Sequence, residues 1–138
     1  MKYIHYGSKE FDINRFEKIK NIELFFKPSG GLWGSRVDID TVWKNWCKRT
    51  GFKTNLKEHF IFSLKEDAKI LTINNNEQLK TLPKRKDIFD GLDFEELSKE
   101  YDAIEVFISE DRELYFSLYG WDCDSIIVMN PSKIIQEK

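Results

Sequence analysis

The sequence predicts an α+β fold built from mainly antiparallel strands with a few flanking helices. Short apolar and β-branched segments outnumber segments with convincing helical periodicity. These segments do not alternate regularly with helices, which argues against a doubly wound parallel sheet. At 138 residues the chain is long enough to bury one core and too short for two comfortable ones. We therefore treat residues 1–138 as a single domain.

The N-terminal third contains three predicted strands and one short helix. Residues 2–6 are aromatic and β-branched, which predicts a strand that ends at the turn 7–8. Residues 11–19 place apolar side chains on one side of a short helix. A second strand is predicted at residues 22–26, and a third, short strand at residues 32–33 follows a turn rich in glycine.

The middle of the chain contains the best helical pattern. Apolar residues recur at helical spacing from Val42 to Cys47, Asp40 or Thr41 can cap the start, and Gly51 can end the helix. Two strands are then predicted at residues 60–64 and 68–73, joined by a charged turn.

The C-terminal half begins with a predicted surface loop at residues 82–91, which carries the basic cluster Lys84, Arg85 and Lys86. Asp93 can cap a helix that places Phe94, Leu97 and Tyr101 on one face. Two further strands are predicted at residues 103–108 and 125–129, and Pro131 ends the second.

Charge and composition argue against several classes of function. The net charge of −2 gives no field that would gather DNA or RNA, so a nucleic-acid partner is unsupported. No apolar run is long enough to cross a bilayer, and the N-terminus does not resemble a secretory leader. We therefore expect a cytoplasmic location and no membrane association. Cys47 and Cys123 are expected to remain thiols, and the spacing of His, Cys and Asp residues predicts no metal site.

Three short motifs follow one another in a fixed order and carry the functional prediction. The first is His5-Tyr6-Gly7-Ser8 at the end of the first strand, and the second is the run from Gly30 to Ser35. The third, Asp122-Cys123-Asp124-Ser125, leads into an apolar strand closed by Asn130-Pro131.

In this order the motifs resemble the ADP-ribosyltransferase fold, in its poly(ADP-ribose) polymerase-like branch. Members begin with a strand ending in His-x-Gly-Ser or Thr, continue with a Gly-Leu/Ile-Tyr-Phe-type strand, and in some cases have a helix ending in Asn-Tyr-Cys. This chain has Gly31-Leu32-Trp33 and Asn45-Trp46-Cys47 at the corresponding places. The resemblance implies two packed, mainly antiparallel sheets with an NAD-binding cleft between them, and NAD as substrate.

The resemblance also implies roles for individual residues. Gly7 would pair its backbone N–H and C=O with the nicotinamide carboxamide, a close approach that glycine permits. His5 would bond a ribose hydroxyl with Ser8 alongside, Trp33 and Trp46 would flank the nicotinamide ring, and Ser35 would stand in for a serine that relatives place at Trp43. The remaining predicted NAD-binding residues belong to the same motifs and are Tyr6, Gly31 and Leu32.

The reaction implied by the resemblance requires a carboxylate near the ribose, because the departure of nicotinamide creates an oxocarbenium-like centre. Asp124 is the first candidate and Asp122 the second, with His5 as the third member of the predicted catalytic set. Many relatives have glutamate at the start of this strand, where an ungapped count reaches Ser125 instead.

Each residue also has a structural interpretation. His5 can be an ordinary strand histidine, Trp43 and Trp46 can belong to the core, and the loop with Asp122 and Asp124 can simply cap the last strand. Gly30-Gly31 lacks the Gly-Lys-Ser/Thr ending of a phosphate loop, so it does not indicate a nucleoside triphosphatase.

The function implied by the resemblance is transfer of one ADP-ribose from NAD to a macromolecular acceptor, with a protein as the expected class. The chain has the size of small transferases among bacterial toxins and phage-encoded effectors, including some anti-CRISPR proteins. Two alternatives remain: a catalytically inactive member of the fold that binds and inhibits a partner protein, and an NAD glycohydrolase.

Overall fold

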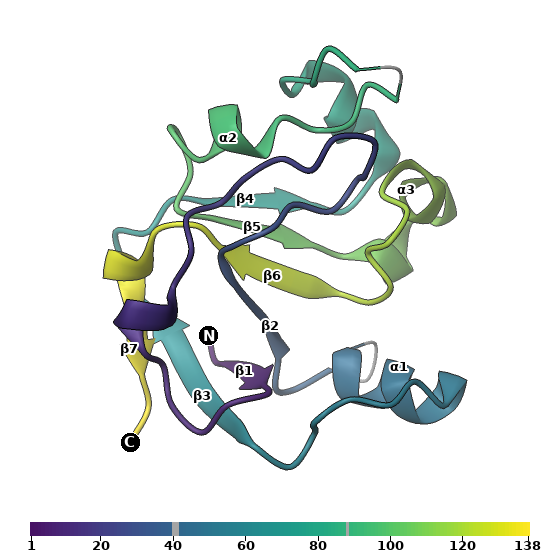
Figure 1. The fold of residues 1–138 in the computed structure, drawn as a ribbon. Helices are drawn as coiled ribbons and strands as arrows, with labels where there is room; N and C mark the ends of the chain where they lie inside the picture. The colour runs from purple at the N-terminus through teal and green to yellow at the C-terminus, as the bar shows by residue number, and fades with distance from the viewer. Residues whose placement is uncertain (40–41, 88) are drawn as a thin grey trace.

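A computed structural model describes residues 1–39, 42–87 and 89–138. The described residues form one mixed, mostly antiparallel sheet of seven strands, hydrogen-bonded in the order β4-β5-β6-β2-β1-β3-β7 (Figure 1). Only the β4–β5 pair is parallel among the strand pairs of the described residues. The strands are β1 (Tyr3–Tyr6), β2 (Leu32–Arg36), β3 (His59–Leu64), β4 (Ile70–Ile73), β5 (Ala103–Val106), β6 (Ser125–Val128) and β7 (Ile134–Gln136).

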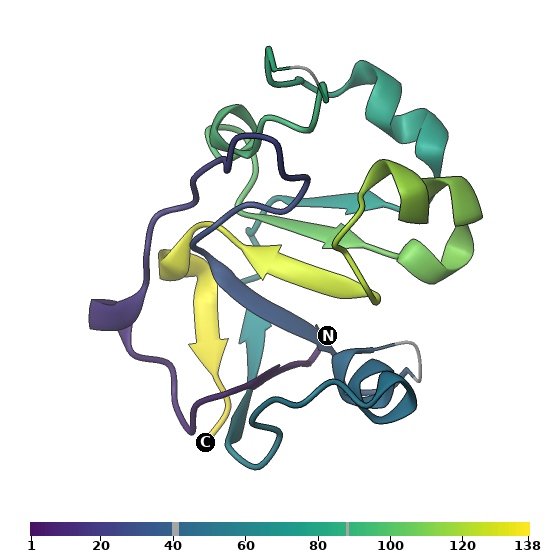
Figure 2. The same cartoon turned by 45° about the vertical axis from the view of Figure 1, so that its right-hand side comes forward.

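The sheet changes direction at β2. In Figures 1 and 2 the strands β4, β5 and β6 run across the molecule, β3 and β7 run steeply, and β2 crosses obliquely between the two groups. β2 is joined to β1 by two residue pairs, Tyr3 with Arg36 and Ile4 with Ser35. The described residues thus confirm the α+β class and the antiparallel majority, but they form one bent sheet where two packed sheets were predicted, and they show no cleft between sheets.

Side chains alternate between the two faces of the sheet and build a core on each. In β6, Ile127 packs into one hydrophobic cluster, while its neighbours Ile126 and Val128 pack into the other. This is the period-2 alternation of a strand that is buried on both faces. The first cluster also contains Trp121, which is 1% exposed, and the second contains Phe62, which is fully buried.

Two of the three α-helices that the described residues form were predicted. Helix α1 (Trp43–Thr50) ends at Gly51, whose φ of 75° is left-handed as the C-cap requires. Its N-cap position is Val42, which makes no side-chain capping bond, and the predicted capping residues 40–41 lie outside the described residues.

The other two helices are short and begin at aspartates. In α2 (Phe94–Leu97) the Asp93 carboxylate accepts a hydrogen bond from Glu96 N–H, as predicted. Helix α3 (Arg112–Ser117) begins in the same way at Asp111. Helix α3 lacks a periodic apolar pattern because Leu114 is its one buried residue, so it was not predicted.

In the part of the chain that the structure describes, four short 3-10 helices connect the larger elements. They are η1 (Ile13–Arg15), η2 (Asn76–Thr81), η3 (Ile108–Glu110) and η4 (Pro131–Lys133). The prediction of a helix over residues 11–19 was therefore too long, since only the turn η1 forms there. The strand predicted at residues 103–108 ends at Val106, and Ile108, its predicted last residue, begins η3 instead.

The predicted strand at residues 22–26 does not form. Arg85, a member of the basic cluster predicted to lie on the surface, is 8% exposed and directs its guanidinium into this segment. Its Nη1 donates to the carbonyl oxygens of Ile22, at 2.6 Å, and Phe25. A buried side chain therefore takes the place of a neighbouring strand as the partner of this backbone.

The strands predicted at residues 60–64 and 68–73 both form, as β3 and β4, but they do not pair with each other. They lie far apart in the strand order, and β3 pairs instead with β1 and with β7, whose three residues were not predicted. Within the described residues, no helix has the length and apolar character needed to span a membrane.

Candidate functional site

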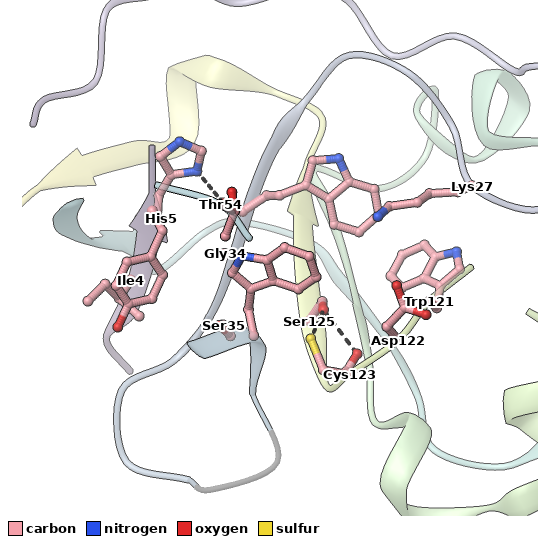
Figure 3. A pocket seen from close by; sticks show the side chains of 13 residues that line it. Ile4, His5, Lys27, Gly34, Ser35, Thr54, Trp121, Asp122, Cys123 and Ser125 are labelled. Carbon is pink, nitrogen blue, oxygen red and sulfur yellow. Dashed lines mark hydrogen bonds between the residues drawn. The ribbon is translucent and has the colours of Figure 1, made fainter. Parts of the chain in front are cut away.

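The strand order brings the three sequence motifs together at one cavity. β2 pairs with β1 on one side and with β6 on the other, so strands from opposite ends of the chain become neighbours. A cavity of about 250 Å³ opens beside them (Figure 3). The predicted site residues that line it are His5, Tyr6, Trp33, Ser35 and Asp122. The other predicted site residues lie outside this lining: Gly7, Ser8, Gly31, Leu32, Trp46 and Asp124.

His5 lies on β1, and one hydrogen bond determines which tautomer its neutral ring adopts. Its Nδ1 lies 2.6 Å from the carbonyl oxygen of Trp33, and a carbonyl can only accept a hydrogen bond. Nδ1 therefore carries the proton, and Nε2 is left with a lone pair. Burial lowers the pKa of His5 below its usual value, although the Trp33 carbonyl opposes this shift. The site thus favours a neutral imidazole with Nε2 as an acceptor.

Trp33 is the aromatic centre of the cavity. Its ring meets that of Trp121 at a centroid distance of 4.8 Å in an edge-to-face arrangement. The Lys27 ammonium lies 4.7 Å from the centroid of the Trp33 ring, which is a cation–π contact. Figure 3 shows Lys27 beside Trp121 and Asp122, with His5 on the opposite side of the cavity. The Trp33 ring therefore already holds a cation against its face.

The two candidate carboxylates face different surroundings. Asp122 lines this cavity, whereas Asp124 is 3% exposed and lines a second cavity. The Asp124 carboxylate accepts hydrogen bonds from the backbone N–H of Ser109, at 2.9 Å, and from its hydroxyl, at 2.6 Å. These hydrogen bonds direct the Asp124 carboxylate to Ser109 of η3, which lines the second cavity and not the first. The geometry therefore favours Asp122 as the carboxylate that acts in the first cavity.

Cys123 is a lining residue without thiolate character. Burial, the main cause, raises its pKa to about 11. Its Sγ lies 3.3 Å from the Ser125 hydroxyl, which also donates to the Cys123 carbonyl oxygen at 3.0 Å. Cys47 is also buried, with a pKa raised by burial, and both cysteines are free. Neither thiol is activated as a nucleophile.

Gly7 has a structural reason to be glycine. Its φ is 118°, which side chains rarely tolerate, and its N–H donates to the Glu58 carbonyl oxygen at 2.8 Å. The N–H that the resemblance assigns to the nicotinamide carboxamide is thus already bonded within the protein. A Cβ at Gly7 would meet nothing closer than His5 Nε2, at 3.9 Å, so conformation rather than space accounts for this glycine. Ser8 bonds weakly to the Glu10 carbonyl oxygen.

Gly31 and Leu32 hold β2 against the rest of the sheet. Gly31 has a φ of 72°, and a Cβ there would lie 2.8 Å from Ile127 Cγ1. Leu32 is buried in the second hydrophobic cluster. Both residues position Trp33 without lining the cavity.

Trp46 lies against the second cavity, whose volume is about 330 Å³. Its ring stacks on that of Trp43, with centroids 5.1 Å apart and planes 13° apart. Trp43 lines the first cavity, so helix α1 contributes one indole to each. Asp122 and Cys123 line both cavities, which therefore adjoin.

Three residues that line the first cavity were not predicted as site residues: Lys27, Thr54 and Trp121. Lys27 and Thr54 lie in segments without regular structure, where no periodic pattern shows the direction of a side chain. Across residues 1–39, 42–87 and 89–138, no group of three or more His, Cys, Asp or Glu side chains is placed to hold a metal ion.

Comparisons with known protein families, with curated proteins and with solved structures gave no match for this chain.

Proposed function

We propose that this protein is an NAD-dependent mono-ADP-ribosyltransferase that modifies a macromolecular acceptor, with a protein as the expected class. The observation that carries the proposal is the convergence of the three motifs: His5, Trp33 and Asp122 come from separate parts of the chain and line one cavity. The resemblance rests on the motifs and their order along the chain, so the proximity of these residues in space is independent support for the proposal.

The size of the cavity supports a partial enclosure of NAD. Pockets that hold whole drug-sized ligands occupy about 300–1,000 Å³. At about 250 Å³, this cavity suits the nicotinamide and its ribose. The diphosphate and adenosine would then extend over the neighbouring surface.

The aromatic and charged side chains of the cavity complement the positively charged nicotinamide and the negatively charged diphosphate of NAD. The positively charged nicotinamide would bind the indole face of Trp33 in place of the Lys27 ammonium, which occupies a cation position there. Lys27 is the one lysine or arginine among the described lining residues. Once displaced, its ammonium is available to the diphosphate as a counter-charge.

The reaction follows from the same residues. As the bond between nicotinamide and ribose breaks, positive charge develops on the ribose, and the Asp122 carboxylate stabilises it electrostatically. His5 Nε2 accepts a hydrogen bond from a ribose hydroxyl and so orients the sugar. Nicotinamide leaves with the electron pair of the broken bond, and an acceptor nucleophile bonds to the anomeric carbon.

Two observations favour a second candidate, an inactive member of the fold that binds a partner protein. The Gly7 N–H is bonded to Glu58, and the Asp124 carboxylate is bonded to Ser109. Both groups are thus used to stabilise the fold. An NAD glycohydrolase would use the same cavity with water as the acceptor.

The proposal is tested by incubating the purified protein with adenylate-labelled NAD, with and without a cell lysate. We expect label on a lysate protein, lost in His5→Ala and retained in the matched control His59→Ala, because His59 is an exposed histidine on β3. Nicotinamide release without protein labelling would establish the glycohydrolase instead. No binding and no turnover of NAD would contradict the proposal and leave the inactive binding protein.

A further inference from the structure

A third cavity, of about 320 Å³, lies between η2, α3 and the loop that follows η2. Among the described residues, it shares no lining residue with the first or the second cavity. Pockets for small ligands occupy about 300–1,000 Å³, and this volume is at the lower end of that range. The cavity therefore suits a small molecule with a single ring.

Much of the lining of this cavity is apolar. The rings of Phe26 and Phe89 pack at a centroid distance of 5.8 Å, and Phe116, on α3, is 63% exposed. Aromatic rings that remain exposed offer faces and edges against which another ring can pack. Beside them lie three buried leucines: Leu79, Leu92 and Leu118. The body of a ligand here is therefore aromatic.

Lys84 places a fixed ammonium at this apolar lining. Its Nζ donates to the carbonyl oxygens of Leu79 and of Leu82, the second at 3.1 Å. An ammonium has three N–H donors, so one donor remains. Among the ion pairs of the described residues, none includes Lys84. A positive charge that only carbonyl dipoles hold in place, with one N–H left over, is suited to bind an anion.

The other polar lining residues supply further donors and one carboxylate. The carboxamide oxygen of Asn76 accepts a hydrogen bond from the Ser117 hydroxyl, and the carboxamide nitrogen has no partner among the described residues. Lys80 pairs with Glu77 in an exposed contact, which contributes little to stability. Asp90 is the one carboxylate among the described lining residues, and it is exposed to solvent, which screens its charge.

We propose that this cavity binds a small aromatic carboxylate. The ring packs against Phe89 and Phe116, and the carboxylate accepts the remaining N–H of Lys84. A carboxylate fits better than a phosphate dianion, because the Asp90 carboxylate would repel a second negative charge. Within the described residues, none that the proposed transfer reaction uses lines this cavity, so the site stands independently of that reaction.

Three probes with the same ring isolate the charge. Phenylacetate carries a carboxylate, phenylacetamide is its neutral counterpart, and phenethylamine carries an ammonium. Titration of the isotope-labelled protein at neutral pH, followed through the backbone amide signals of Gly91 and Leu92 in the NMR spectrum, gives the dissociation constants. We expect phenylacetate to bind about tenfold more tightly than phenylacetamide and phenethylamine to bind most weakly, because only the carboxylate pairs with the ammonium.

Two lysines of the same loop supply a matched pair of variants. Lys84→Met removes the ammonium and keeps an unbranched side chain, so it should weaken phenylacetate binding about tenfold. Lys86→Met removes an exposed charge outside the cavity lining and should leave binding unchanged. Asp90→Asn should tighten binding about twofold by removing a like charge. Urea denaturation checks the fold of Lys84→Met, and the probe series tests the charge preference on the wild type itself.

The location of the probe completes the test. Nuclear Overhauser contacts from the phenylacetate ring to the methyl groups of Leu92 and Leu118, with the expected order of probes and variants, would support the site. Equal affinities for phenylacetate and phenylacetamide would overturn it. Contacts with Trp33 of the first cavity instead, or unchanged signals of Gly91 and Leu92 at millimolar phenylacetate, would overturn it as well. None of these measurements uses NAD, so their results do not depend on the transferase.

Discussion

Raising the pH above 10 should destabilise this protein through Tyr3, which lies in β1 close to His5. Tyr3 is 2% exposed, and burial together with the neighbouring Glu105 carboxylate raises its pKa from 10.0 to about 12. Its hydroxyl lies 3.5 Å from Glu105 Oε1, and Arg36 binds both oxygens of that carboxylate, at 2.7 and 3.0 Å. Three strands, β1, β2 and β5, thus meet at one buried polar group.

The size of the effect follows from the pKa difference. The unfolded chain loses the Tyr3 proton near pH 10 and the folded protein near pH 12, so the stabilising contribution is complete below pH 10 and is lost as the pH rises through 12. Each pKa unit corresponds to about 1.4 kcal/mol. The free energy of unfolding should therefore fall by about 1 kcal/mol at pH 11 and by about 3 kcal/mol well above pH 12.

Urea denaturation at pH 9 and pH 11, followed by circular dichroism, measures this loss, with Tyr3→Phe as the control. The phenylalanine variant retains the ring that stacks on Phe62 at 5.5 Å but has no group to ionise. Wild type should lose about 1 kcal/mol more than Tyr3→Phe between the two pH values. Equal losses in the two proteins would refute the reasoning.

Three further results are expected. Gly31→Ala should lower the free energy of unfolding by more than about 2 kcal/mol, because it combines a left-handed φ with a 2.8 Å clash. Gly51→Ala, which has an equally left-handed φ but open space around the added Cβ, should lower it by about 1 kcal/mol. Equal urea midpoints for the two variants would contradict this expectation. NAD affinity, measured by calorimetry, should remain constant as the pH falls to 6.5 and weaken only below that pH, because burial lowers the pKa of His5. If the affinity already weakened above pH 7, a neutral His5 could not be the acceptor of the ribose hydrogen bond. Iodoacetamide should leave the Cys123 thiol unmodified at pH 8 in the folded protein, because burial raises the pKa of this thiol to about 11. In urea the same thiol should be modified. Rapid labelling of the folded protein would contradict the burial of Cys123.

Local sequence patterns predicted the strands that form the centre of the sheet. Alternating or β-branched runs at residues 2–6, 60–64 and 125–129 match β1, β3 and β6 within one residue at each end. The strand predicted at residues 22–26 failed for a tertiary reason, because the guanidinium of Arg85 bonds its carbonyl oxygens. No local pattern could reveal that contact between distant segments.

The site was predicted in part. His5, Trp33 and Asp122 do line one cavity, but the preferred carboxylate, Asp124, points into the adjacent one. Both aspartates precede β6, and residues two apart share a face of a strand, so strand alternation cannot distinguish Asp122 from Asp124. The hydrogen bonds from Ser109 to Asp124 distinguish them, and no local pattern in the sequence could reveal that contact between separate segments.

Nicotinamide release from NAD in the presence of the cell lysate, measured by chromatography for wild type, Asp122→Asn and Asp124→Asn, tests the central claim most directly. The two substitutions are the same chemical change at residues on opposite sides of Cys123, and urea denaturation of each variant checks the fold. The account predicts release by wild type, a loss of about 100-fold or more in Asp122→Asn, and turnover retained in folded Asp124→Asn. No release by wild type, or full activity in Asp122→Asn, would contradict it.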